Sequence, residues 1–205
     1  MMQKDTKPRL LNFNDLEAAV KVMSEAFFMD PLWVYLLPNE GRRKKVLKSF
    51  FEILLLAGIS NNQVYGVSNP IEGVVIWEKP DSTFNFPWKV LIPGIVFFIM
   101  NIVVLIRAWP VFRKFNSMQK NNAPGKHYYL ISIGINPKSQ GKGLASILIR
   151  PFLDEAIRNG YGVYTETVTP ENVPIYEHYG LKVVEKFSFK EKKLDLWAFY
   201  LMNEM

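Results

Sequence analysis

Two glycines and a lysine stand where an extended pattern gives way to a helical one, in the run Gln140-Gly-Lys-Gly143. Glycine lets the backbone approach a ligand closely and turn its amides outward. These amides begin a helix, whose N-terminus carries a partial charge of about +0.5, and Lys142 adds a full positive charge. The residues therefore predict an anion site, most naturally for phosphate or pyrophosphate. A tight strand-to-helix turn without a ligand would use the same residues.

Two common nucleotide-binding motifs do not fit this loop. Gly143 is not followed by the lysine and hydroxyl residue that a P-loop requires. The dinucleotide-binding fingerprint needs a third glycine at position 146, where this chain has Ser146. Both classes of nucleotide-binding protein are therefore set aside.

A strand before the loop and a helix after it must position these amides. Residues 127–136 alternate like a strand, which ends at Asn136-Pro137 because proline has no N–H to donate. From Leu144 to about Arg158, apolar residues recur with the 3.6-residue period of a helix. Simple alternation predicts that one face of the strand carries His127, Tyr129, Ile131, Ile133 and Ile135.

This strand, loop and helix resemble the donor-binding region of the GNAT N-acetyltransferase superfamily. Gln140-x-x-Gly143-x-Ala145 matches the Q/R-x-x-G-x-G/A signature of that superfamily, and Val163–Val168 resembles the strand that follows. Asn172–Lys182 resembles its N-x-x-x-Y-x-x-x-G-F segment, with Leu181 in place of the phenylalanine. The specific resemblance covers 60 residues, from His127 to Lys186.

The resemblance implies an α/β fold, with a mixed, twisted sheet of six to seven strands flanked by helices on both faces. It also implies acetyl-CoA, or another acyl-CoA, as the donor. The pyrophosphate is expected on the amides of residues 140–145, and the pantetheine arm along residues 133–135, where Gly134 offers no side chain. The residues that the resemblance assigns to the donor are Ile133, Gly134, Ile135, Gln140, Gly141, Lys142, Gly143, Leu144, Ala145 and Asn172.

The resemblance further implies transfer of an acetyl group to an amine. Direct attack in a ternary complex fits best, because the chain has no cysteine that could form an acyl-enzyme. The amine must lose a proton and the leaving thiolate must gain one. Tyr176 lies four residues after Asn172, on the same helical face, and is the predicted proton donor. Glu166, inside an apolar strand, is the predicted base, acting through water. Packing of the tyrosine and a salt bridge of the glutamate are the structural alternatives, while Tyr179 and His127 are weaker candidates for the two roles.

Composition restricts the class of protein. The 205 residues are 49% hydrophobic, which suits one domain, with an acceptor-side half at about 1–125 and a CoA-binding half at about 126–205. The absence of cysteine excludes disulfides and thiolate metal sites, and two histidines leave few ligands for a metal ion.

The net charge of +6 suits a polyanionic ligand or an anionic membrane; nucleic acid is not expected. The polar start predicts no signal peptide, and we expect a cytoplasmic monomer or homodimer acting on a small-molecule or peptide amine.

The first half of the chain is expected to form strands and helices around this region. A strand at 9–13 precedes a helix that Asn14 and Glu17 are predicted to cap. A second helix is expected at 40–59, a hairpin at 63–67 and 72–77, and an antiparallel pair at 182–189 and 194–202.

Residues 90–106 form an uncharged apolar run, interrupted by Pro93, Gly94 and Asn101. As a helix it would reach about 26 Å, short of the roughly 30 Å of a hydrocarbon core. We expect a buried helix that covers the acceptor side; contact with a membrane or a partner protein is the alternative, and a membrane span is the least favoured. Two other functions stay open on this basis, a non-catalytic CoA-binding module and a membrane-associated protein that works through this run.

Overall fold

The computed structural model describes residues 7–82, 85, 87 and 91–202 of the chain. Seven strands form one sheet in the order β1-β2-β3-β4-β5-β7-β6, in which β4 and β5 run parallel and all other neighbours run antiparallel. The predicted α/β sheet is therefore confirmed, at its upper strand number. The strands are β1 (Arg9–Leu10), β2 (Val64–Val67), β3 (Gly73–Glu78), β4 (His127–Ile135), β5 (Gly162–Thr167), β6 (Lys182–Phe189) and β7 (Leu194–Leu201).

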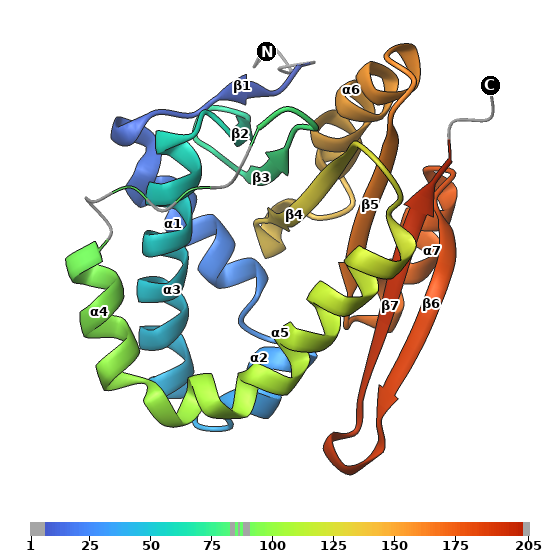
Figure 1. Cartoon of the computed structure of the whole chain (residues 1–205). Coiled ribbons are helices and arrows are strands. Elements are labelled where there is room, and N and C mark those ends of the chain that lie inside the picture. The colour runs from blue at the N-terminus through green and yellow to red at the C-terminus, as the bar shows by residue number, and fades with distance from the viewer. Residues whose placement is uncertain (1–6, 83–84, 86, 88–90, 203–205) are drawn as a thin grey trace.

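Helices cover both faces of the sheet (Figure 1). A separate cluster of buried side chains lies between the sheet and the helices on each face. One face carries α1 (Leu16–Ala26), α2 (Pro31–Leu36), α3 (Glu40–Ser60), α4 (Leu91–Met100) and α5 (Ile102–Asn122). The other face carries α6 (Leu144–Arg158) and α7 (Val173–His178). The predicted helix at 40–59, the hairpin and the C-terminal antiparallel pair are confirmed.

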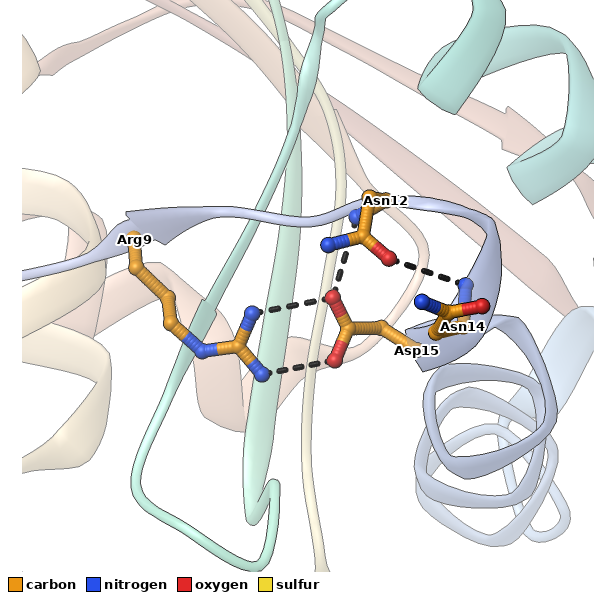
Figure 2. A network of polar contacts seen from close by, with 4 residues as sticks. All are labelled: Arg9, Asn12, Asn14 and Asp15. Atoms are coloured by element: carbon orange, nitrogen blue, oxygen red, sulfur yellow. Dashed lines mark hydrogen bonds and ion pairs between the residues drawn. The ribbon is translucent and has the colours of Figure 1, made fainter.

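The predicted cap of the first helix is wrong by one short turn. Asn12 and Asp15, not Asn14 and Glu17, form the capping box, on a 3-10 turn at Phe13–Asp15 that precedes α1. The Asp15 carboxylate also accepts two hydrogen bonds from the Arg9 guanidinium, at 2.7 and 2.9 Å (Figure 2). This network ties the short strand β1 to the start of α1.

A β-bulge in β4 overturns the predicted alternation of its faces. Against β3, Ile76 pairs with Ser132 and the next residue, Trp77, pairs with Leu130, so Ile131 is the extra residue. Tyr129 and Ile131 pack against the cluster under α1 and α3, whereas Ile133 and Ile135 pack against the cluster under α6. The extra residue reverses the facing of every later side chain.

The apolar run 90–106 does not form the buried helix that the sequence predicts. Within its described part, the chain breaks at Asn101 into α4 and α5, and much of the apolar surface is exposed, with Ile99 67% and Met100 72% accessible. Beyond this run, α5 continues as helix to Asn122. In the described chain no single helix is long and apolar enough to cross a bilayer; only the pair Gly94–Met100 and Ile102–Asn122, bent by 99°, reaches that length and apolarity together.

Candidate active site

The cavity that holds the candidate site begins where β4 and β5 separate. These strands pair only from His127 with Gly162 to Leu130 with Thr165. Beyond that point the second half of β4 follows β3, and β5 follows β7. The separation starts at the bulge in β4, and a cavity of about 720 Å³ lies at the free end of the strand. Its walls are β4, the loop before α6, the first turn of α6, α7, and the corner between α1 and α2.

The glycine loop has the conformation that an anion site needs. Gly141 and Gly143 have φ values of +76° and +78°, a region that residues with a Cβ rarely adopt. A Cβ built at either position meets no atom within 4 Å, so the space beside the backbone is open. No side chain caps the N-terminus of α6, which leaves its first amides available to a ligand. The loop therefore fits a phosphate or pyrophosphate group.

Nine of the ten residues predicted to contact the donor line this one cavity. They come from β4, the loop, the start of α6 and the turn before α7, and are Ile133, Gly134, Ile135, Gln140, Gly141, Gly143, Leu144, Ala145 and Asn172. Lys142 is the exception. Its Nζ donates to Ser139 Oγ at 3.0 Å and lies 3.7 Å from Glu72 Oε1, so an acidic neighbour offsets part of its charge.

Gly134 also has a packing reason to lack a side chain. A Cβ on Gly134 would lie 2.7 Å from Met23 Sδ and 3.1 Å from Ala26 Cβ. The glycine therefore allows α1 to pack closely against β4. Because of the bulge, Ile133 and Ile135 face the other side of the sheet and pack toward α6.

Tyr176, the predicted proton donor, lies in the wall of the cavity. Its side chain is buried, with its ring centroid 5.2 Å from that of Phe199. Burial, with a smaller effect of the Glu166 charge, raises the pKa of Tyr176 to about 12, against the opposite effect of a hydrogen bond with Thr165. The phenol therefore stays protonated at neutral pH. Asn172 donates from Nδ2 to Thr167 Oγ1 at 3.2 Å, which fixes the preceding turn to the end of β5.

Glu166, the predicted base, lies at the strand separation but outside the cavity wall. Tyr129 donates its hydroxyl proton to Glu166 Oε2 at 2.9 Å, and Oε1 is buried with no hydrogen-bond partner in the described structure. Burial raises the pKa of Glu166 to about 7, against the opposite effect of the Tyr129 and Tyr164 hydroxyls. A carboxyl group with this pKa can take and release a proton near neutral pH.

The two weaker candidates lie in different places. Tyr179 lines the same cavity. His127, at the other end of β4, lies with Nδ1 3.0 Å from the carbonyl oxygen of Gly125 and its ring 6.1 Å from that of Tyr164. His127 does not line the cavity.

Asp30 is a candidate residue that the sequence reasoning missed. It lines the cavity, accepts a hydrogen bond from the Leu32 amide at 3.0 Å as the N-cap of α2, and accepts another from Thr169 Oγ1 at 3.0 Å. Burial raises the pKa of Asp30, an effect that these hydrogen bonds partly oppose. In the sequence, the Asp30-Pro31 pair indicates only the end of a helix. Its contact with Thr169, 139 positions later in the chain, depends on the tertiary structure.

In the portion of the chain with described coordinates, no three His, Cys, Asp or Glu side chains gather closely enough to hold a metal ion.

Comparisons with known proteins agree with the resemblance seen in the sequence. Residues 102–181 match the family model described as the acetyltransferase (GNAT) family. An uncharacterized N-acetyltransferase of Schizosaccharomyces pombe is 28% identical over 174 residues, which cover 81% of this chain and 70% of the relative.

Solved acetyltransferase structures share the fold at low sequence identity. A histone acetyltransferase HPA2 and related acetyltransferase from Corynebacterium glutamicum is 18% identical, with a TM-score of 0.66 and 97% of each chain covered. Arylalkylamine N-acetyltransferase 2 from Aedes aegypti is 12% identical, with a TM-score of 0.65 and coverage of 97% of this chain and 99% of the other. A polyamine N-acetyltransferase from Drosophila melanogaster is 11% identical, with a TM-score of 0.58 and coverage of 95% and 98%.

Proposed function

We propose that the chain is an acetyltransferase of the GNAT superfamily, whose family model matches residues 102–181, and that it transfers an acetyl group from acetyl-CoA to the amine of a small molecule or a peptide. One observation carries the proposal. The uncapped N-terminus of α6, with its two positive-φ glycines, opens onto the same cavity that Tyr176 lines. An anion site and a proton donor thus share one space.

The donor would be held by two kinds of contact. The amides of the loop and of the first turn of α6 would bind the pyrophosphate, and the unpaired edge of β4 from Ile133 to Ile135 would bind the pantetheine arm. Acetyl-CoA supplies an acetyl group activated as a thioester. Lys142 would add long-range attraction rather than direct contact, since Glu72 and Ser139 hold its amine.

In the proposed reaction Tyr176 protonates the leaving sulfur. The phenol carries its proton at neutral pH because burial raises its pKa to about 12. An ordinary thiol has a pKa of about 8.5, so the phenol is the weaker acid and delivers its proton only as negative charge develops on the sulfur. Such positioned acids typically contribute a factor of about 10² to 10⁴ in rate.

Two carboxyl groups compete for the role of base. Glu166, with a pKa of about 7, is the group better matched to neutral pH and would act through a water molecule. Asp30 lies in the cavity wall itself, but the Leu32 amide and the Thr169 hydroxyl already bind its two oxygens. We assign proton removal to Glu166 and regard Asp30 as the group that holds the α1–α2 corner against the loop after β5.

The acceptor is proposed to be a primary amine with an apolar part. Carboxyl groups at Asp30 and Glu166 favour a cationic amine, and Phe27, Met29 and Pro31 supply apolar wall between α1 and α2. The Aedes and Drosophila proteins of similar fold are named for arylalkylamines and polyamines. These two amine classes are therefore the first acceptors to test.

The decisive experiment is an acceptor panel with acetyl-CoA, read by release of free thiol. Arylalkylamines, polyamines and peptide amines are compared with a reaction that lacks an acceptor, which measures hydrolysis. We expect amine-dependent thiol release with an acetylated amine as the product. Thiol release that no amine accelerates, in a protein that binds acetyl-CoA, would contradict amine acetylation.

A further inference from the structure

The outer surface of α4 and α5 concentrates the exposed apolar side chains of the molecule. Of the nineteen large apolar side chains that are exposed in the described structure, ten lie within residues 95–112. We call this set the α4–α5 apolar face. Its members are Ile95, Val96, Phe98, Ile99, Met100, Ile102, Val103, Ile106, Trp109 and Phe112.

The core does not need these residues. In α5 the inward stripe consists of Val104, Ala108, Val111 and Met118, all buried. On the opposite side a helix that faces water would carry polar residues, yet Val103, Ile106 and Trp109 are 61%, 64% and 66% exposed. Exposed apolar patches of this kind mark interaction surfaces.

The bend at Asn101 gives the face a convex shape. The chain turns by 99° between α4 and α5, and the residues on both sides of the turn are among the most exposed, with Ile99 at 67%, Met100 at 72% and Val103 at 61%. Figure 1 shows the bend at one end of the molecule, away from the sheet. A convex corner can insert into a deformable surface, whereas a partner protein would need a groove of matching shape.

The charges around the face have one dominant sign. The chain has no aspartate or glutamate from residue 82 to residue 153, a stretch that includes both helices. Arg107 and Arg113 are exposed on α5 itself. The first turns of α3 add four exposed basic residues, Arg42, Lys44, Lys45 and Lys48, against one exposed acidic residue, Glu40.

These basic residues lie close to the apolar face. α4 packs on α3 through Phe97 and Phe50, whose ring centroids are 6.4 Å apart. The Arg107 guanidinium lies 5.3 Å from the ring centroid of Tyr35 in α2, the helix just before α3. The apolar corner and the basic start of α3 therefore belong to one end of the molecule.

We propose that the α4–α5 apolar face docks on the surface of an anionic lipid bilayer, with the corner at Asn101 in the interfacial layer. Apolar and aromatic side chains bordered by Arg and Lys are the composition of interfacial membrane helices, and each basic residue near an anionic surface adds electrostatic attraction. A second copy of this chain fits less well, because pairing two such faces would bring their positive charges together. The docking concerns where the enzyme works and is independent of its proposed acetyl transfer.

Vesicle flotation with the full chain tests the proposal without any measure of activity. Vesicles of phosphatidylcholine with phosphatidylserine are compared with vesicles of phosphatidylcholine alone. We expect at least about tenfold stronger binding to the anionic vesicles, weakening as salt rises from about 0.05 to about 0.5 M. No flotation with anionic vesicles at low salt would overturn the proposal.

A matched pair of double variants locates the contact. Met100→Glu with Val103→Glu adds two negative charges to the face, and Ile157→Glu with Val184→Glu adds two at exposed apolar positions of α6 and β6. We expect the first variant to lose at least about tenfold in vesicle binding and the second to retain at least half of it. Equal losses, or no loss in either, would overturn the assignment to this face.

Two further measurements check the fold of the variants and the depth of the contact. All four substituted positions are exposed, and circular dichroism shows whether both variants keep their fold. Trp109 gives a direct signal, since brominated lipid should quench a component of the fluorescence that disappears in Trp109→Phe. If sedimentation instead shows a dimer that Met100→Glu with Val103→Glu dissociates, and no vesicle binding, the face is a homodimer interface and the proposal fails.

Discussion

At the scale of single residues, the candidate site combines a phenol and a carboxyl group whose pKa values are raised for the same reason. Burial disfavours the charged form of both Tyr176 and Glu166, but it leaves the phenol well above neutral pH and brings the carboxyl close to it. One group is therefore suited to keep a proton and the other to exchange one. These two roles can be separated by substitutions that retain the shape of each side chain.

Tyr176→Phe retains the ring and its contact with Phe199 but removes the proton. We expect turnover to fall about a hundredfold while the affinity for acetyl-CoA stays within about twofold. Steady-state kinetics and calorimetry measure the two quantities. Tyr179→Phe is the matched control, because Tyr179 lines the same cavity and should tolerate the change. Wild-type turnover in Tyr176→Phe would reduce Tyr176 to a packing role.

The pH dependence of the reaction should report Glu166. For an acceptor whose own amine pKa lies well away from 7, kcat/KM should rise with an apparent pKa of about 7, as the carboxyl loses its proton. Glu166→Gln should lower the rate at least about tenfold and remove this limb of the profile. A limb that persists in Glu166→Gln belongs to another group, and Asp30→Asn is then the next variant to measure.

The same shifted pKa also predicts a direction for stability. Since the pKa of Glu166 rises from 4.5 to about 7 on folding, the folded protein binds this proton more tightly than the unfolded chain does. Its contribution is fully present below pH 4.5 and is lost as pH rises to about 7. Urea unfolding across this range should show less loss of stability with rising pH in Glu166→Gln than in wild type.

At the scale of elements, the strand β4 and the loop that follows it create the proposed donor site. The bulge at Ile131 turns the later isoleucines toward α6, and the end of the pairing with β5 leaves this part of β4 free on one side. The two glycines then turn the chain into α6 without a capping side chain. Each step is local, and together they place free amides beside a free strand edge.

Gly143→Asp tests the loop, because it adds a side chain and a negative charge where phosphates are expected. We expect acetyl-CoA affinity to fall at least tenfold, or roughly 1.4 kcal/mol. Gly160→Asp is the matched control, since Gly160 has a similar φ of +73° just past the other end of α6 and does not line the cavity. Unchanged affinity in a folded Gly143→Asp protein would remove the assignment of this loop to the donor.

At the scale of the whole molecule, charge and apolar surface are both unevenly distributed. The stretch from residue 82 to residue 153 lacks acidic residues and contains the glycine loop as well as the α4–α5 apolar face. A protein with a net charge of +6 should attract a polyanionic donor over several ångströms. This attraction should weaken as salt screens it.

Salt should therefore raise the KM for acetyl-CoA several-fold between about 0.05 and about 0.5 M, with little change in kcat. Acetyl-pantetheine, which lacks the nucleotide phosphates, serves as the control donor, and its KM should be nearly independent of salt. An equal salt effect on both donors would show that the charges act on the acceptor or on the fold. Initial rates with a fixed, saturating amine measure the comparison.

The sequence alone determined the features that depend on neighbouring residues. The order of strand, glycine loop and helix from His127 to Arg158, the hairpin of β2 and β3, and the C-terminal pair of strands follow from periodicity and from glycine and proline. Most of the predicted donor residues share one wall because they follow one another along the chain. Only Lys142 differs, since its partner Glu72 comes from another part of the chain.

The tertiary structure decided what depends on distant partners. The bulge at Ile131 is set by pairing with β3, and the need for glycine at position 134 is set by α1. Asp30 joins the cavity only because the loop after β5 reaches it. The run 90–106 is equally apolar whether it is buried or exposed, and a hydrophobic pattern does not reveal whether the fold has room for it. Here α1 and α3 already fill most of the core on that face, so only a few described side chains of the run, such as Val104, are buried and most stay outside.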